Sequence, residues 1–130
     1  MPGKQTTPNP TQGELAILHV LWEQGPSTVR AVWEKLNRQG RTGYTTVLKL
    51  MQIMAQKGLV SRDESQKTHV YRAAIAKAKT ERRLVRDVLD RVFGGSAERL
   101  VMRALEERDI TPDELARIQE LLDRKGREQS

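Results

Sequence analysis

The chain has 130 residues and a mass of 14.8 kDa, which allows one domain or two small ones and excludes a large multi-layer enzyme. Hydrophobic residues make up 37% of the sequence but aromatic residues only 4%, so we expect a small aliphatic core, which helices suit better than a β-sandwich. The chain contains no cysteine, which excludes disulfides, thiolate chemistry and zinc ribbons.

The N-terminal segment and the hydropathy pattern indicate where the protein works. No window approaches the roughly 18 to 20 unbroken apolar residues that cross a bilayer. The first ten residues, MPGKQTTPNP, lack the apolar core of a signal peptide, and they are too rich in proline and too poor in apolar residues to order themselves. We therefore predict a cytoplasmic protein with no membrane insertion and with a disordered tail at residues 1–10.

The formal net charge of +6 is unevenly distributed along the chain. Residues 1–75 contain ten Lys and Arg against five Asp and Glu, whereas residues 76–130 contain thirteen against twelve. A positive field attracts polyanions, and the phosphate backbone of a nucleic acid is the commonest polyanion that a small basic domain meets. The charge therefore favours a nucleic-acid partner for the first part of the chain.

Two helices are predicted directly after the tail. The first begins at Thr11, which has the spacing of a capping box with Glu14, and a Gly-Pro pair ends it after residue 24. The second, VRAVWEKLNRQ, follows a cap at Ser27 or Thr28 and ends before Gly40.

The third predicted helix, YTTVLKLMQIMAQK at 44–57, has two different faces. At about 100° per residue, one face collects the apolar side chains and the other collects Thr45, Lys49, Gln52 and Gln56. The whole segment contains no Asp or Glu, although solvated helix faces usually mix both signs of charge. A face without carboxylates suits contact with phosphates.

The remainder is predicted to form a β-hairpin and three more helices. LVSRDE and THVYRAAI are short β-prone runs separated by polar residues, and amphipathic helices are expected at about 77–93, 96–107 and 112–125. The fold class is therefore mainly α with a small β-hairpin: a winged helix-turn-helix followed by a C-terminal helical dimerisation region. We place the winged-helix DNA-binding domain at 11–75 and the helical dimerisation domain at 76–130.

DNA contacts are predicted on the third helix and around the hairpin. Short polar side chains and Lys read base edges in the major groove, so Thr45, Thr46 and Lys49 are the predicted base-reading residues. Cations and helix N-termini suit phosphate oxygens. The predicted backbone contacts are Thr28, Arg30, Arg41, Tyr44, Lys67, His69 and Arg72. The alternative for each cation is a solvated surface position, and for Tyr44 it is packing.

A dimer is predicted because helices of about 12 to 17 residues with a single apolar stripe are marginal alone and must cover that stripe. A second copy would cover it, and a two-fold contact would place two third helices about 34–36 Å apart, one turn of DNA. The predicted dimer residues are Leu84, Val88, Leu100, Leu105, Leu115, Ile118 and Leu122.

Catalysis and metal binding are not expected. The sequence has no Gly-rich phosphate loop and no nucleophile motif, and His19 and His69 are fifty residues apart without a carboxylate cluster. We predict neither a cofactor nor a metal. The alternative to DNA binding is a winged helix that contacts another protein without specific DNA binding, for which a neutral or acidic third helix is expected.

The motifs T-x-x-E-L-x-I-L-x-x-L-W-E at 11–23, V-R-x-V-x-x-x-L at 29–36, Y-T-T-V-L at 44–48, M-x-x-K-G-L-V at 54–60 and H-V-Y-R at 69–72 occur in this order, followed by F-G-G-S and L-V within 93–101. Together they resemble the penicillinase-repressor family of the BlaI, MecI and CopY type, over about residues 11–125. The resemblance implies a dimeric transcriptional repressor whose winged helix binds an inverted-repeat operator. It places the DNA-reading residues at Thr45 and Thr46 and the dimer in the C-terminal helices.

Two features of the family are missing from this chain. Drug-resistance members are cut at an Asn-Phe pair after a sensor signal, and the matching positions here are Arg103-Ala104, so we do not expect cleavage of that specificity. Copper-responsive members sense metal through C-terminal cysteines, which this chain does not have. The resemblance implies a regulatory protease or membrane sensor as a partner. No motif specifies the operator, the regulated genes or the inducing signal.

Overall fold

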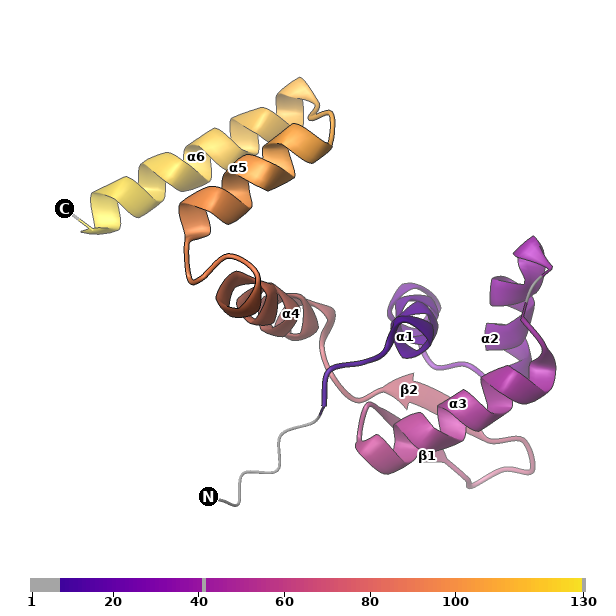
Figure 1. The fold of residues 1–130 in the computed structure, drawn as a ribbon. Coiled ribbons are helices and arrows are strands. Elements are labelled where there is room, and N and C mark those ends of the chain that lie inside the picture. The colour runs from indigo at the N-terminus through magenta and orange to yellow at the C-terminus, as the bar shows by residue number, and fades with distance from the viewer. Residues whose placement is uncertain (1–7, 41, 130) are drawn as a thin grey trace, which may run out of the picture. The chain divides into compact units, whose positions relative to one another are not determined.

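The computed structural model describes residues 8–40 and 42–129, and this part contains six α-helices and a two-stranded sheet (Figure 1). In chain order the elements are α1 (Gln12–Gln24), α2 (Val29–Leu36), α3 (Tyr44–Lys57), β1 (Val60–Asp63), β2 (Val70–Ala73), α4 (Lys77–Arg91), α5 (Ala97–Glu107) and α6 (Pro112–Gln129). The predicted fold class is confirmed. Residues 1–7 of the predicted tail lie outside the described residues.

The chain divides into two compact units, one that extends to Val85 and one that begins at Arg86. The boundary falls inside α4, so the first turns of this helix belong with the hairpin and the three preceding helices. Thr80 is buried there, and its hydroxyl donates to the Ala76 carbonyl at 3.0 Å. The assignment of DNA binding to residues 11–75 and of dimerisation to 76–130 stays a prediction.

Polar side chains cap the first two helices. Thr11 and Glu14 form the predicted capping box, in which the Glu14 amide donates to Thr11 Oγ1 at 3.2 Å and the Thr11 amide donates to Glu14 Oε1 at 2.9 Å. At α2 the cap is Thr28, whose hydroxyl accepts from the Ala31 amide at 3.1 Å. The Ser27 hydroxyl instead donates to the Gly25 carbonyl at 2.9 Å.

The second helix is shorter than the sequence predicts. The α-helix ends at Leu36, and Asn37–Gln39 form a 3-10 turn that closes on Gly40, where φ is 71°. The Gly40 amide donates to the Asn37 carbonyl at 2.7 Å. The prediction of one continuous helix is wrong for these three residues, because the last turn tightens to i→i+3 bonding before the left-handed glycine.

The hairpin is attached to the segment that precedes α2. β1 and β2 pair in antiparallel fashion, with Val60 opposite Ala73, as the sequence predicts. Tyr71 of β2 also bridges to Ser27: the Ser27 amide donates to the Tyr71 carbonyl at 2.9 Å, and the Tyr71 amide donates to the Ser27 carbonyl at 2.8 Å. The backbone therefore joins the hairpin directly to the start of α2.

The core of the first unit is aliphatic, as the composition predicts. It contains the inner sides of α1, α2 and α3 together with the strand residues that face them. Its buried members are Ile17, Leu18, Val20, Leu21, Val29, Val32, Val47, Met51, Met54, Leu59, Val60 and Tyr71. Burial of each large apolar side chain stabilises the fold by about 1.5–3 kcal/mol, so this cluster fixes which side of each helix faces inward.

One charged group is buried beside this core. Glu14 is only 1% exposed, and its Oε2 accepts a hydrogen bond from Lys57 Nζ at 2.7 Å. Burial would raise the pKa of the Glu14 carboxyl, but the hydrogen bonds from Lys57 and from the Thr11 amide outweigh it and hold the pKa below its ordinary value of 4.5. The ion pair thus joins the beginning of α1 to the end of α3.

The helices of the second unit are confirmed close to their predicted positions. Gly94 and Gly95 follow α4 with φ values of 58° and 85°, and the Gly95 amide donates to the Leu89 carbonyl at 2.8 Å. Thr111 caps α6 by accepting from the Glu114 amide at 3.1 Å. This last helix continues four residues beyond its predicted end.

Apolar side chains of α4, α5 and α6 remain exposed in the single chain. None of the described residues from Arg86 onward is buried, although each of these helices is amphipathic. The exposed large apolar residues on the three helices are Val85, Val88, Val101, Met102, Leu105, Leu115, Leu121 and Leu122, and Val92 is exposed directly after α4. Within the described range, none of the helices is long and apolar enough to cross a membrane.

Glu14→Gln tests the buried ion pair. We expect the free energy of unfolding at neutral pH to fall by about 1–3 kcal/mol, because the Lys57 ammonium loses its charged partner. Since the folded-state pKa of Glu14 lies below 4.5, the contribution of the pair is present above that pH and is lost as the pH falls through the folded-state value. The difference from the wild type should therefore shrink in acid.

Urea unfolding of the full chain at fixed protein concentration, repeated over a pH series, measures this difference. Glu120→Gln on α6 is the control, because its side chain is exposed and the substitution removes the same charge. Equal stability of Glu14→Gln and the wild type at neutral pH would contradict a structural role for the pair.

Candidate nucleic-acid interface

The outer face of α3 is exposed along its whole length. Thr45, Lys49, Gln52 and Gln56 are all solvent-exposed, as is Thr46 beside them. The opposite side of the same helix is fully buried, with Val47, Met51 and Met54 at 0% exposure. The predicted division of the helix into an apolar inner face and a polar, carboxylate-free outer face is confirmed. Its contact with bases stays a prediction.

A groove lies beside this face, between the start of α2, the outer side of α3 and the hairpin. Its volume is about 320 Å³. We call it the α2–hairpin groove, and its lining residues are Thr28, Val29, Arg30, Tyr44, Leu48, Gln52, Arg62, Lys67, Thr68, His69 and Tyr71. The structure thus brings together five of the seven predicted backbone-contact residues, which lie far apart in the sequence.

The two remaining predicted contacts are not part of this groove. Arg72 is exposed on β2 but does not line the groove. Arg41 lies outside the described residues.

The groove is lined by cationic and neutral residues. Arg30, Arg62 and Lys67 carry positive charge, whereas no Asp or Glu is among the lining residues. Arg30 also lies over the Trp33 ring, with its guanidinium carbon 5.8 Å from the ring centre, and its Nε is 3.6 Å from Glu34 Oε2. An anion in the groove would therefore meet several positive groups and the capped start of α2.

Tyr44 packs against a neighbouring ring and also lines the groove, and its phosphate contact stays a prediction. Its ring packs edge-on against Trp33 with 5.8 Å between the ring centres, yet the residue is 40% exposed and lines the groove. Trp33 Nε1 in turn donates to the Thr42 carbonyl at 2.9 Å. This indole bond positions the connection that leads into α3.

Arg62 is a groove residue that the sequence analysis missed. It lies on β1, and its Nη1 donates to the Tyr71 hydroxyl at 3.5 Å, while its Nε and Nη2 lie 2.7 Å and 2.6 Å from Glu64 Oε2. The hydrogen bonds to Tyr71 and Glu64 raise the pKa of Arg62 above its ordinary value. The signal in the sequence is a cation in the predicted strand LVSRDE, close to the hairpin cations Lys67 and Arg72.

Asp63 shapes the turn of the hairpin. Its Oδ1 accepts from the Ser65 amide at 2.9 Å, and hydrogen bonds from Ser65 are the main reason why the pKa of Asp63 lies below its ordinary value. Arg72 and His69 lower it further through their charges. This turn places the Lys67–His69 segment at the edge of the groove.

The histidines do not meet in this fold. His19 is exposed and packs edge-on against Trp22, with 5.4 Å between ring centres, whereas His69 lines the groove. In the part of the chain that the structure describes, no three His, Asp or Glu side chains are grouped as metal ligands would be. The absence of cofactor and metal binding stays a prediction.

Three helices followed by a hairpin, with the outer face of the third helix exposed, define a winged helix-turn-helix protein. The chain belongs to the penicillinase repressor family, whose model matches residues 10–124. The sequence-based resemblance is therefore confirmed. The family consists of transcriptional repressors rather than enzymes.

The chain is similar to methicillin resistance regulatory proteins along most of its length. The methicillin resistance regulatory protein MecI of Mammaliicoccus sciuri is 18% identical over 115 residues, which cover 88% of this chain and 94% of that protein. The MecI proteins of Staphylococcus aureus strain N315 and of Staphylococcus epidermidis match with the same identity and coverage.

The solution structure of the DNA-binding domain of the repressor BlaI has a related fold. It superposes with a TM-score of 0.50 and 18% identity, over 56% of this chain and 89% of that domain. This likeness confirms the winged-helix architecture.

The predicted dimer residues lie on α4, α5 and α6, partly exposed. Val88, Leu105, Leu115 and Leu122 are between 39% and 54% exposed. The other three, which are half-buried, are Leu84, Leu100 and Ile118. All seven keep apolar surface in contact with solvent in the single chain.

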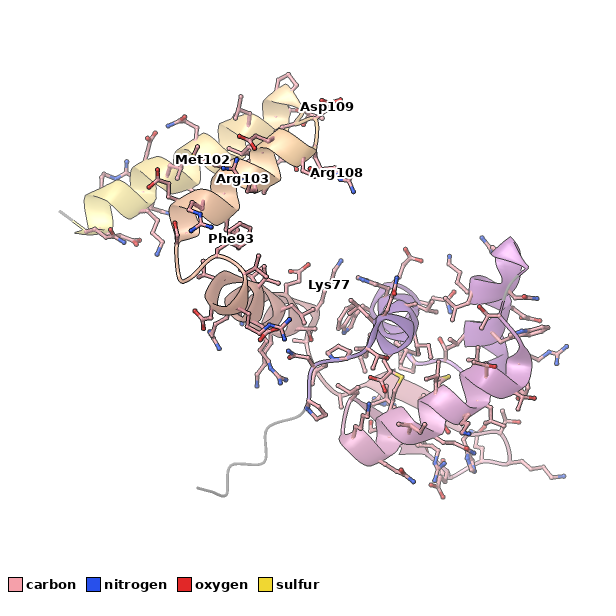
Figure 2. All side chains as sticks on the ribbon, in the orientation of Figure 1. Lys77, Phe93, Met102, Arg103, Arg108 and Asp109 are labelled. Atoms are coloured by element: carbon pink, nitrogen blue, oxygen red, sulfur yellow. The ribbon has the colours of Figure 1, made fainter. Side chains whose placement is uncertain are left out.

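Arg103-Ala104, at the positions of the family's cleavage pair, lies within α5. Figure 2 labels Arg103 there beside Met102, and the Arg103 guanidinium forms an ion pair with Glu106. Both residues of the pair are exposed on a regular helix. Cleavage of this chain is not expected from the residue types, and this expectation stays a prediction.

Proposed function

We propose that the protein is a DNA-binding transcriptional repressor that occupies an inverted-repeat operator as a homodimer and blocks transcription until a signal releases it. One observation carries the proposal: the outer face of α3, which contains no carboxylate, is exposed beside a groove lined by cations. Because chromosomal DNA is the target, we infer a cytoplasmic location.

Base reading is assigned to the first turns of α3. Thr45, Thr46 and Lys49 are exposed there, and their hydroxyl, methyl and ammonium groups match the acceptors and the thymine methyl that line the major groove. The buried inner face of α3 supports this assignment, since it prevents the helix from turning these side chains inward.

Backbone phosphates are assigned to the α2–hairpin groove. Thr28 and Arg30 approach them from α2, Tyr44 from α3, and Lys67 and His69 from the hairpin. Arg72 and Arg41 are proposed as further contacts at the hairpin and before α3. Contacts of this kind position a duplex without specifying its sequence.

The dimer is assigned to the apolar residues of α4, α5 and α6. A single chain leaves Val88, Leu105, Leu115 and Leu122 in water, and a second copy would bury them. Two-fold pairing would also present two α3 helices to successive major grooves, about 34–36 Å apart. A domain of this size gains affinity for DNA from the doubled phosphate contacts.

Lys49→Glu tests the reading face. We expect DNA binding to be lost, because a carboxylate would face the duplex, while the melting temperature and the dimer stay nearly unchanged because the side chain is exposed. Genomic fragments selected by the wild-type protein provide the operator for a fluorescence titration.

Unchanged operator affinity of Lys49→Glu would contradict the placement of this face. The alternative function, a winged helix that binds protein, predicts a different salt response. Operator binding should weaken steeply with salt because counterions are released, whereas tight, salt-insensitive binding to a protein would favour the alternative.

Thr46→Ala tests base contact by an individual side chain. We expect the preference among operator variants to relax more than total affinity falls, because backbone contacts remain. Binding selections with wild-type and Thr46→Ala protein measure the two preference profiles. Identical profiles would count against a base contact at Thr46.

Leu122→Glu tests the dimer. The side chain is 54% exposed in the single chain, so a monomer should tolerate the charge, whereas a dimer that buries Leu122 should dissociate. Analytical ultracentrifugation at micromolar concentration measures the change. Ala116→Glu is the matched control, because it places the same charge on another face of α6. A monomeric wild type, or a dimeric Leu122→Glu, would contradict this assignment.

A further inference from the structure

Arg62 is held at the α2–hairpin groove by two partners of different kinds. Tyr71 is 1% exposed, and its hydroxyl accepts from Arg62 Nη1 at 3.5 Å. Glu64 is exposed on the hairpin turn, and its Oε2 lies 2.6 Å and 2.7 Å from Nη2 and Nε of the same guanidinium. The first partner is fixed in the core, whereas the second can move into solvent.

The buried Tyr71 also links Arg62 to the start of α2. Its backbone exchanges two hydrogen bonds with Ser27, and the next residue, Thr28, caps α2 and lines the groove. The guanidinium of Arg62 and the segment before α2 therefore both contact Tyr71.

Glu64 pairs with one of the three cations that line the groove. The lining residues include Arg30, Arg62 and Lys67 and no carboxylate. Glu64 does not line the groove, but it occupies the Nε and Nη2 edge of Arg62, which is the edge that binds phosphate through two N–H groups.

We propose that the α2–hairpin groove binds one DNA backbone phosphate on Arg62, and that Glu64 holds this guanidinium in the free protein until the phosphate replaces it. The inference rests on the proposed DNA binding and identifies a phosphate-contact residue and a competing carboxylate within it. The Tyr71 hydroxyl keeps the guanidinium in place during the exchange.

The exchange is energetically feasible because the two contacts differ in strength. A solvent-exposed ion pair stabilises little, because water screens the two charges, so Glu64 is released easily. A phosphate accepts from two N–H groups of the guanidinium and releases a condensed counterion from the DNA. Glu64 therefore lowers affinity without preventing binding.

Glu64→Gln should raise the affinity for duplex DNA by about two- to fivefold, because the competing charge is removed and an exposed ion pair is weak. The probe is a fluorescent duplex of mixed sequence, about 30 base pairs long, because backbone contacts do not depend on sequence. Glu81→Gln is the matched control, since it removes the same charge from an exposed position on α4.

Arg62→Gln should weaken binding to the same duplex and reduce the slope of log affinity against log salt by about one. In this background the gain from Glu64→Gln should vanish, since no guanidinium remains to be freed. Arg62→Lys keeps the charge but loses the two-pronged donor, so its affinity should lie between those of Arg62→Gln and the wild type.

Side-chain NMR of the full chain follows the exchange directly. The Arg62 Nε–H and the Glu64 carboxyl carbon should both shift, and at the same duplex concentration. A shift at Arg62 without one at Glu64 would overturn the exchange. The exchange would also be overturned if Glu64→Gln raised the affinity for the duplex no more than Glu81→Gln does, or if it raised the affinity equally in the Arg62→Gln background.

The two proposals fail in different ways. A protein that binds no duplex at all, in any salt, would overturn the proposed function together with this site. Sequence-specific, salt-dependent binding in which Arg62→Gln has no effect would overturn this site alone and leave the repressor function standing.

Discussion

Burial of one side of α3 is the constraint on which the candidate interface depends. Val47, Met51 and Met54 have no solvent exposure, so the helix cannot rotate about its own axis without exposing them. The Lys57–Glu14 ion pair holds the end of the helix. The outer face is therefore presented in one orientation, and the α2–hairpin groove keeps a constant position beside it.

The second unit shows the opposite balance between packing and exposure. The hydroxyls of Ser96 and Thr111 accept hydrogen bonds from backbone amides and cap α5 and α6. None of the described residues of this unit is buried. Amphipathic helices of this length owe most of their stability to packing. The proposed homodimer would supply that packing, and the two-fold symmetry of an inverted repeat would match it.

The chain belongs to the penicillinase repressor family although it is only 18% identical to the MecI proteins. Such divergence is compatible with one fold because caps and apolar periodicity tolerate many residue choices. This chain has Arg103-Ala104 at the positions expected for a cleavage pair, and it contains no cysteine, so its sequence names no releasing signal.

The sequence by itself determined the helices, the hairpin and the two faces of α3, because capping and apolar periodicity act over a few residues. It missed the 3-10 turn at Asn37–Gln39, where the left-handed Gly40 tightened the last turn. Only the tertiary structure brought Thr28, Tyr44 and His69 to one groove and placed Arg62 between Tyr71 and Glu64. The Arg62 contacts follow from the register of the hairpin, in which Tyr71 lies opposite Arg62. The groove depends on how the hairpin bonds to the segment before α2, and no local pattern encodes a pairing between residues so far apart in the chain.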